Sequence, residues 1–377
     1  MSATTKPHKF AETARRLLAE AGIAVNGPNP WDLQVHDERL YARVFAQGSL
    51  GLGEAYMDGW WDCEALDELI ARTIRRRVQE RIPRNLPTAL LHVQARVANR
   101  QTKRRAFIVG EVHYDLGNDL FESTFDSRIT GSCGYWKDAE DLDAAQDAKL
   151  DLICRKIGLR SGQRVLDIGC GWGAFMGFAA EKYGAKCYGV TISKEQVAYI
   201  HQRYAGLPVQ AELKDYRDVE GEFDHVVSMG MFEHVGPKNY RAYFETAHRV
   251  LKEDGFFLLH TIGGNRSANQ IDPWLDKYIF PNGVLPSVAQ IGRAIEGLFV
   301  VEDWHNFGAD YDKTLMAWFH KFDTNWHKLR EKYGERFYRM WKYYLLACAG
   351  GFRARHIHLW QVALAKRGVP GGYATVR

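Results

Sequence analysis

The chain has 377 residues, 46% hydrophobic and 25% charged, which is an ordinary globular composition and enough length for two domains. Its formal net charge of +4 is too small by itself to indicate nucleic-acid binding. The sequence contains no run of about 18 or more uncharged apolar residues and no apolar segment at its N-terminus, so it predicts neither a membrane span nor a secretory signal.

The six cysteines lie far apart, at positions 63, 133, 154, 170, 187 and 348, with neither metal-ligand spacing nor the spacing of a disulfide framework. Such cysteines are typical of a reducing cytoplasm. We therefore expect free thiols, no metal site and a cytoplasmic protein. Cys133 has no histidine nearby in the sequence and is interpreted as a buried thiol rather than a nucleophile.

Mainly helical patterns fill the N-terminal part of the chain. We expect helices over residues 10–21, 38–46 and 66–77 and a short strand over 31–36. Gly48, Gly51 and Gly53 are expected to break the pattern after the second helix. Trp60 and Trp61 are interpreted as core residues, although the amphipathic indole ring would also suit a lipid surface.

A basic stretch runs from Arg72 to Arg105, with eleven lysines and arginines against one acid, Glu80. Apolar residues recur within it at helical spacing, from Leu86 to Val97. A solvated helix or a linker would have this composition, and so would a segment that adsorbs to anionic lipid head groups. We place a domain boundary near residue 105, which gives a smaller, mainly helical domain over 1–105 and a larger domain over 106–377.

Strands and helices alternate regularly in the larger domain. We expect strands over residues 164–168, 187–192, 209–213, 223–229, 255–262, 299–304 and 358–365, and helices over 145–157, 174–183, 194–204, 240–251, 287–298, 311–329 and 335–349. Residues 263–286 form an insertion outside this alternation, and Ser193 and Gln196 fit a capping box. The pattern predicts an α/β protein with a mostly parallel, doubly wound sheet, whose ligands bind at the carboxyl ends of the strands.

The stretch from Arg164 to Gly173 is the most informative, because an apolar strand ends there at Gly169, Gly171 and Gly173 and a helix follows. Glycine lets a backbone turn sharply and approach a ligand closely. The spacing is not the Gly-x-Gly-x-x-Gly of a dinucleotide site, and no Lys-Ser/Thr of a phosphate loop follows. We interpret the stretch as a nucleoside cofactor site that favours S-adenosylmethionine over NAD, although a purely structural turn would also use glycines.

Polar residues follow the other strands. The second strand ends at Thr191 without a carboxylate, so a neutral residue such as Gln196 would have to bind a ribose that an acid often binds. Tyr216, after the third strand, suits the edge of an adenine. Glu233 follows the fourth strand and His260 ends the fifth, and together they could form either an acid–base site or a structural contact.

Five segments together resemble the bacterial cyclopropane-fatty-acyl-phospholipid synthases and their relatives, the mycolic acid cyclopropane synthases. They are GSCGYW (131–136), VLDIGCGWG (165–173), GVTIS (189–193), MFEHVG (231–236) and LHTIG (259–263). No single motif is specific, but the combination is, and the resemblance covers essentially the whole chain. It implies a Rossmann-like, S-adenosylmethionine-dependent methyltransferase fold.

The resemblance also implies a reaction and a site. A methylene from S-adenosylmethionine would be added to the cis double bond of unsaturated acyl chains in membrane phospholipids, giving a cyclopropane ring. In the family a bound bicarbonate accepts the proton, and its cage corresponds here to Cys133, Glu233, His260, the backbone of Ile262, and Tyr311. The cofactor would contact Ser132, Gly169, Gly171, Ile192, Gln196 and Tyr216.

Three alternatives remain at this point. A methyltransferase that makes methyl-branched lipids would keep the cofactor loop without needing the full cage. An NAD-dependent oxidoreductase is disfavoured by the glycine spacing, and a lipid-binding protein would not need Glu233, His260 and Tyr311 together. The resemblance further implies a homodimer without nucleic-acid partners, which works peripherally at an anionic membrane surface, on the inner face of the plasma membrane.

Overall fold

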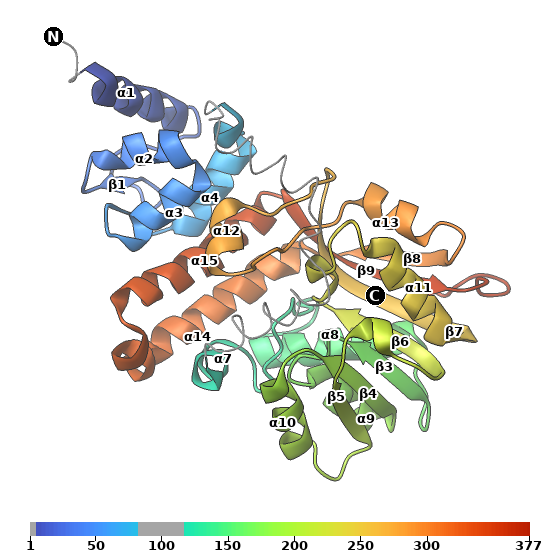
Figure 1. Cartoon of the computed structure of the whole chain (residues 1–377). Helices are drawn as coiled ribbons and strands as arrows, with labels where there is room; N and C mark the ends of the chain where they lie inside the picture. Colours follow the sequence, from blue (N-terminus) through green and yellow to red (C-terminus); the bar gives the residue numbers. More distant parts are fainter. Residues whose placement is uncertain (1–4, 82–116) are drawn as a thin grey trace. The chain divides into compact units, whose positions relative to one another are not determined.

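The computed structural model describes residues 5–81 and 117–377, which form two compact units (Figure 1). The described part of the first unit comprises residues 5–81, 270–281 and 315–357. The second comprises residues 117–269, 282–314 and 358–377. The domain boundary expected near residue 105 lies outside the described residues and stays a prediction. The sequence did not indicate that 270–281 and 315–357 belong with the N-terminal residues.

The first unit is mainly helical, as expected for the N-terminal part. Two short strands, β1 (Gln34–Val35) and β2 (Trp61–Asp62), pair antiparallel. The helices are α1 (Thr5–Ala19), α2 (Arg39–Gln47), α3 (Ser49–Met57), α4 (Leu66–Arg75), the 3-10 turn η1 (Val78–Arg81), α12 (Pro273–Tyr278), the later part of α14 (Ala309–Tyr333), and α15 (Glu335–Arg353).

The break expected at Gly48 is confirmed, because α2 ends and α3 begins there, but the breaks expected at Gly51 and Gly53 are wrong, because α3 runs through both. A Cβ on Gly51 would lie 2.5 Å from the carbonyl oxygen of Arg43, and one on Gly53 would lie 2.4 Å from the Trp274 ring. Only glycine permits such close packing. The two glycines therefore let α3 approach its neighbours, and Gly48, with a φ of 60°, makes the turn between α2 and α3.

The two adjacent tryptophans have different surroundings. Trp61 is fully buried, and its indole nitrogen donates a hydrogen bond to the carbonyl oxygen of Leu52 at 3.0 Å. Trp60 is only half-buried, beneath the guanidinium groups of Arg39 and Arg43 at 4.7 and 4.8 Å from the ring centroid. The core interpretation is confirmed for Trp61, whereas Trp60 lies under charged side chains.

A seven-stranded sheet organises the second unit, in the order β5-β4-β3-β6-β7-β9-β8. The strands are β3 (Arg164–Ile168), β4 (Lys186–Thr191), β5 (Val209–Leu213), β6 (Phe223–Met229), β7 (Leu251–Gly264), β8 (Val300–Asn306) and β9 (Ile357–Ala365). The first five strands in this order pair parallel, whereas β8 and β9 pair antiparallel to each other. The mostly parallel sheet is confirmed.

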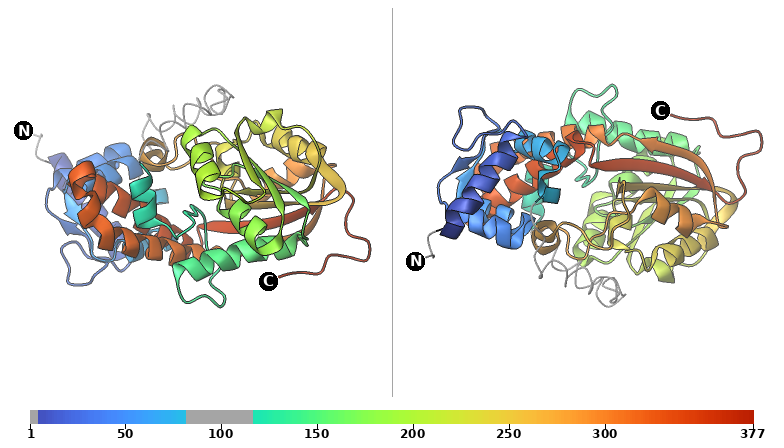
Figure 2. Two further views of the ribbon diagram at one scale, coloured as in Figure 1. Left: turned by 90° about the horizontal axis from the view of Figure 1, so that it is seen from below. Right: turned by 90° about the horizontal axis from the view of Figure 1, so that it is seen from above.

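Helices cover both faces of this sheet (Figure 2). The helices of this unit that lie outside α14 are α7 (Asn118–Thr124), α8 (Leu142–Lys156), α9 (Ala174–Tyr183), α10 (Lys194–Arg203), α11 (Tyr240–Val250) and α13 (Val288–Ile295), with 3-10 turns η2 (Tyr216–Asp218) and η3 (Phe232–His234). Of these, α8, α9 and α10 pack on one face of the sheet, and α11 and α13 pack on the other.

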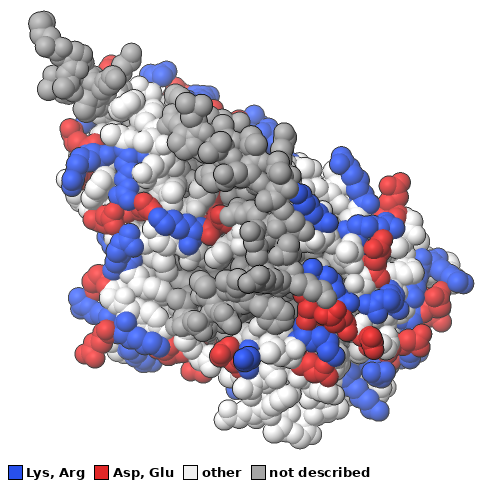
Figure 3. Space-filling model, in the orientation of Figure 1, with Lys and Arg blue, Asp and Glu red and all other residues white. Residues whose placement is uncertain are grey.

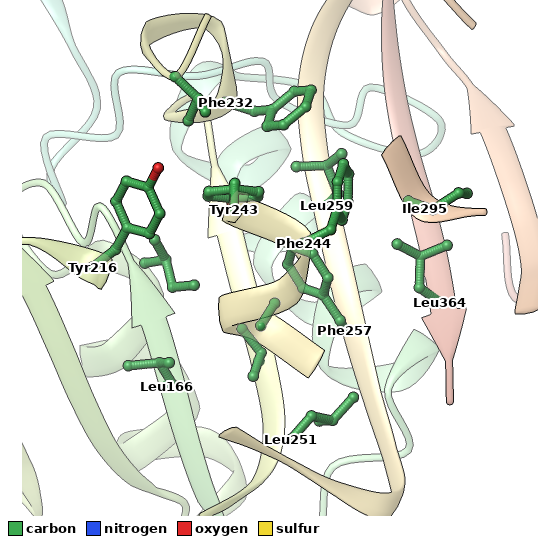
Figure 4. Close-up of a cluster of buried hydrophobic side chains, with 14 of the residues drawn as sticks. Leu166, Tyr216, Phe232, Tyr243, Phe244, Leu251, Phe257, Leu259, Ile295 and Leu364 are labelled. Atoms are coloured by element: carbon green, nitrogen blue, oxygen red, sulfur yellow. The ribbon is translucent and has the colours of Figure 1, made fainter. Parts of the chain in front are cut away.

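Strand residues alternate between the two faces, as a pleated sheet requires. Leu166 and Leu259 face α11 and α13, in the aromatic-rich core of Figure 4, whereas Val165, Val227 and Leu258 face α8, α9 and α10. Because β3, β4, β5 and β6 pair parallel, their carboxyl ends meet at one edge of the sheet. Helices α8 and α9 cover one face of the sheet.

Candidate active site

The glycine turn after β3 has the geometry expected of a close approach to a ligand. Gly169, Gly171 and Gly173 have φ values of 79°, 54° and 79°, in the left-handed region that favours glycine. A Cβ on Gly169 would lie 2.5 Å from the Met231 side chain, and one on Gly173 would lie 2.9 Å from Ile200. Among the described residues, no atom other than those of its chain neighbours lies within 4 Å of the Cβ position of Gly171. Gly171, which is half-buried, thus leaves open space beside its backbone at the carboxyl edge of the sheet.

Gln196 lies at the end of β4, where the sequence lacks an acid. The Ser193 hydroxyl caps α10 by accepting a hydrogen bond from the backbone N–H of Gln196 at 3.3 Å, so the N-terminal cap is confirmed. The second half of the expected capping box is wrong, because Gln196 Oε1 instead accepts a 2.6 Å hydrogen bond from the Thr191 hydroxyl. The Gln196 amide Nε2 is buried without a partner in the described part of the chain. Gln196 is therefore held by Thr191 with a free donor, which suits a ribose hydroxyl.

The other two expected cofactor residues on this side are less polar. Ile192 is half-buried immediately after β4. Tyr216, at the start of η2, is buried and packs edge-on against Tyr243 with ring centroids 5.2 Å apart. Burial raises the pKa of Tyr216 to about 12, so the ring is an uncharged wall of the core. The structure places both residues beside the carboxyl ends of β4 and β5.

Ser132 and Cys133 lie on the loop that precedes α8 in the chain, and this loop contacts both α8 and the first turns of α14. The Gln146 side chain of α8 donates to the Ser132 carbonyl oxygen at 2.7 Å. The Cys133 thiol is fully buried, and the Thr314 hydroxyl of α14 lies 3.9 Å from its sulfur. Burial raises the pKa of Cys133 well above its ordinary value, so the thiol is neutral and acts as a hydrogen-bonding group rather than a nucleophile.

Glu233 is fixed against the next strand by one carboxylate oxygen. Its Oε1 accepts a hydrogen bond from the Ile262 amide N–H at 2.6 Å. Its Oε2 is buried and has no partner among the residues described. Burial raises the pKa of Glu233 to about 7. The Ile262 amide N–H is thus occupied by Glu233, and the Ile262 carbonyl oxygen accepts a hydrogen bond from the Thr261 hydroxyl at 3.1 Å.

His260 is fully buried on β7, opposite Met229 at the end of β6. Its Nδ1 lies 3.3 Å from the side-chain nitrogen of Gln361, which can only donate, so the ring proton is placed on Nε2. That Nε2 has no partner within the described chain. Burial, followed by the charges of Lys149 and Lys156, lowers the pKa of His260 well below its ordinary value. His260 is therefore a neutral donor.

Tyr311 lies in the first turn of α14 and is buried, three residues before the Thr314 that contacts Cys133. Phe307, just before α14, packs 6.0 Å from the His260 ring and 5.3 Å from the Tyr135 ring. Contacts through Thr314 and Phe307 thus bring the elements that carry Tyr311, Cys133 and His260 together, while Glu233 joins β7 directly. Among the described residues no hydrogen bond joins Glu233 to His260, because Glu233 binds the Ile262 amide and His260 faces Gln361.

All six cysteines are free thiols, as expected. In the described ranges, no group of three or more His, Cys, Asp or Glu residues is placed to hold a metal ion. Sequence reasoning missed the supporting residues: Gln361, which orients His260, and Lys149, which donates to the Ser132 hydroxyl at 2.9 Å. Both residues act through partners that are far away along the chain, so the local sequence does not show what they contact.

Comparisons with known proteins find similar chains over most of this sequence. A family model described as mycolic acid cyclopropane synthetase matches residues 101–362. The chain is 52% identical over 364 residues to cyclopropane-fatty-acyl-phospholipid synthase of Escherichia coli strain K12, covering 97% of this chain and 95% of that one. It is 33% identical to tuberculostearic acid methyltransferase UfaA1 of Mycobacterium tuberculosis, covering 94% of this chain and 88% of that one.

A solved structure of mycolic acid cyclopropane synthase CmaA1 complexed with SAH and CTAB is also similar. Its TM-score is 0.64 and its identity 34%, over 68% of this chain and 97% of that one. The chain of coclaurine N-methyltransferase, bound to SAH, has a TM-score of 0.70 at 24% identity, over 84% of this chain, and indicates the fold alone.

Proposed function

The chain belongs to the mycolic acid cyclopropane synthetase family and has the fold of S-adenosylmethionine-dependent methyltransferases, and we propose that it converts the cis double bond of unsaturated acyl chains in membrane phospholipids into a cyclopropane ring. S-adenosylmethionine supplies the methyl group, and one proton of that group must leave before the ring closes. The residues around the cofactor turn bind and orient the methyl donor, and Glu233 and His260 hold the group that accepts the proton.

The observation that carries this proposal is a pair of unsatisfied, buried polar atoms. Glu233 Oε2 can accept a hydrogen bond and His260 Nε2 can donate one, and neither has a partner among the described residues. Buried polar atoms without partners are rare unless a ligand completes them. Bicarbonate carries both a hydroxyl donor and anionic acceptors, so these two atoms fit it, with the Cys133 thiol, the Ile262 carbonyl and Tyr311 as further contacts. Bound bicarbonate would supply the base.

The chain's own residues have distinct roles in this proposal. Neutral His260 donates to the anion without taking the proton, because burial keeps its pKa low. Glu233, anchored to the Ile262 amide, orients the anion rather than acting as the base itself. Phe307 and Tyr135 enclose the His260 side with aromatic rings, which exclude water and whose faces favour a neighbouring positive charge.

The principal rival is a methyl-branched product, since the family also contains relatives named as methyltransferases. Such an enzyme would need the donor site but not a base that removes a proton from the added methyl group. The free Glu233 and His260 atoms favour ring closure. An NAD-dependent reaction has no support from the relatives named above.

The test uses purified protein, S-adenosylmethionine and vesicles of an unsaturated phospholipid. Glu233→Gln and His260→Ala should each lower turnover by about 100-fold or more, because each removes a partner of the reacting region. S-adenosylhomocysteine binding, measured by calorimetry, should persist in both variants. His225→Gln is the matched control, since His225 is also a buried histidine of the sheet but lies near the start of β6. Unchanged turnover in the first two variants would remove the anion-cage proposal.

We further propose that the protein works at the membrane from its surface. None of the described helices is long and apolar enough to cross a bilayer. On the face drawn in Figure 3, basic and acidic side chains of the described residues are intermixed, so no broad basic surface is seen there. We propose that the basic stretch attracts anionic lipid; its residues 82–105 lie outside the described residues, while Arg75, Arg76 and Arg77 are exposed. A homodimer is proposed on the family resemblance, and light scattering would test it.

A further inference from the structure

Helix α8 carries two buried lysines, Lys149 and Lys156, seven residues apart on the face that packs against the sheet. Lys156 has its counter-ion, because its Nζ lies 3.0 Å from Asp303 Oδ2. Lys149 has none. Its hydrogen-bond partners within the described chain are the neutral hydroxyl of Ser132 at 2.9 Å and the sulfur of Met229 at 3.8 Å. Lys149 is therefore a fully buried ammonium without a bonded carboxylate.

An unpaired carboxylate lies close to this ammonium. Asp167 on β3 is fully buried, and neither of its oxygens has a hydrogen-bond partner among the described residues. Alternation along the strands places Asp167 on the same sheet face as Val165, toward α8. Burial raises the pKa of Asp167 to about 7, and the nearby charge of Lys149 lowers it. The two groups are thus near enough to influence each other but are not joined by an ion pair.

A buried ammonium and a buried carboxyl group that are not joined require an explanation, since burying either group without a partner is costly. Asp167 lies two residues before Gly169, the first residue of the glycine turn, and Lys149 donates a hydrogen bond to Ser132. The turn and Ser132 both belong to the expected cofactor site. A ligand with a carboxylate and an ammonium on one short unit would satisfy both. The amino-acid end of S-adenosylmethionine is such a unit.

We infer that Lys149 binds the carboxylate of the amino-acid end of S-adenosylmethionine, and that it shares this carboxylate with the Ser132 hydroxyl. The inference rests on the proposed function, since it takes S-adenosylmethionine as the ligand. Lys149 is then a binding residue, and it supplies a charge that the neutral groups Ser132, Gln196 and Gly171 lack.

Two other roles for Lys149 fit the contacts less well. As a mere support for Ser132 it would be redundant, because Gln146 already holds the Ser132 carbonyl at 2.7 Å. As a partner of the caged anion it would be expected to touch the cage, yet no hydrogen bond joins it to Cys133 or His260 in the described interactions. Both roles are nevertheless distinguished by the experiment.

The experiment compares two ligands that differ by one carboxylate: S-adenosylmethionine and decarboxylated S-adenosylmethionine, titrated by calorimetry without lipid. The unaltered protein should bind the decarboxylated ligand at least about 10-fold more weakly. In Lys149→Met the dissociation constant for S-adenosylmethionine should rise about 10- to 100-fold, whereas that for the decarboxylated ligand should not rise. The ratio of the two constants should therefore fall toward one.

Lys156→Met is the matched control, because it removes an equally buried lysine of the same helix while Arg377 still binds Asp303. It should leave the ratio unchanged. Equal binding of the two ligands by the unaltered protein would overturn the inference without any variant having to fold. If Lys149→Met weakened the binding of both ligands equally, Lys149 would only support Ser132. If the ratio of the two dissociation constants stayed unchanged and turnover required more bicarbonate, Lys149 would belong to the cage. Either result would overturn the inference. If the unaltered protein bound neither S-adenosylmethionine nor 5′-methylthioadenosine, the proposed function would fail as well.

Discussion

Replacing Glu233 by Gln should change how the stability of the protein depends on pH. Below pH 4.5, the ordinary pKa of a glutamate, this carboxyl group is protonated in both the folded and the unfolded chain. Burial raises its pKa in the folded protein to about 7. Between these two pH values only the unfolded chain loses the proton, so the free energy of unfolding falls as the pH rises, and the loss is complete above about pH 7.

The size of this effect follows from the shift. A pKa change from 4.5 to about 7 corresponds to about 3 kcal/mol, at roughly 1.4 kcal/mol per unit. Gln cannot titrate, and its oxygen can still accept the hydrogen bond of the Ile262 amide. Urea unfolding of the ligand-free protein between pH 4.5 and 8 should therefore show the unaltered protein losing about 3 kcal/mol more than Glu233→Gln. Parallel profiles for the two proteins would refute the reasoning, because they would mean that Glu233 titrates normally.

Three further predictions concern other parts of the chain. Asp303→Asn removes the counter-ion of the buried Lys156 and of the exposed Arg377, and it should lower the free energy of unfolding by about 3 kcal/mol, measured in urea; a loss below about 1 kcal/mol would contradict the ion-pair account. Gly171→Ala and Gly158→Ala both place a Cβ in open space at positive φ, and each should cost about 1 kcal/mol of stability. Only Gly171→Ala should weaken S-adenosylhomocysteine binding in calorimetry, by about 10-fold or more, and equal affinities would remove Gly171 from the site. Reversing the charges of Arg75–Arg77 should weaken sedimentation with anionic vesicles, as should added salt, whereas insensitivity to both would indicate a plain linker.

The sheet and its cofactor turn were largely predictable from the sequence, because local signals specify them. The helix expected over 174–183 is α9, and the strand over 223–229 is β6, both with the same bounds. Apolar strands followed by glycines and helices repeat through this part of the chain, so each element could be recognised without knowledge of its neighbours.

Features that depend on distant contacts were not predictable. Gly53 was expected to break a helix, but it lies within α3 and packs against the Trp274 ring, where a Cβ would not fit. Trp274 is more than two hundred residues away in the sequence, so the local pattern could not show this contact. Gln196 was expected to complete a local cap, but Thr191 offers its side chain a better partner. The membership of 270–281 and 315–357 in the first unit is of the same kind.

The candidate site was predictable as a set of motif residues but not as a set of interactions. Glu233 and His260 were recognised from the resemblance, and the structure adds that each keeps one unpartnered polar atom. Lys149 gave a signal in the sequence that was not used. Together with Gln146 and Lys156 it is a polar residue on the otherwise apolar face of α8, and a lysine in a helix is ordinarily assumed to face solvent.

The most direct test of the central claim follows the methyl group itself. The protein would be incubated with S-adenosylmethionine that carries a trideuterated methyl group and with vesicles of one defined cis-unsaturated phospholipid, and the product would be analysed by mass spectrometry and proton NMR. Ring closure predicts that two of the three deuterons are retained in the product, and that the vinyl protons are replaced by cyclopropane signals. Retention of all three deuterons, or of a double bond, would contradict the account.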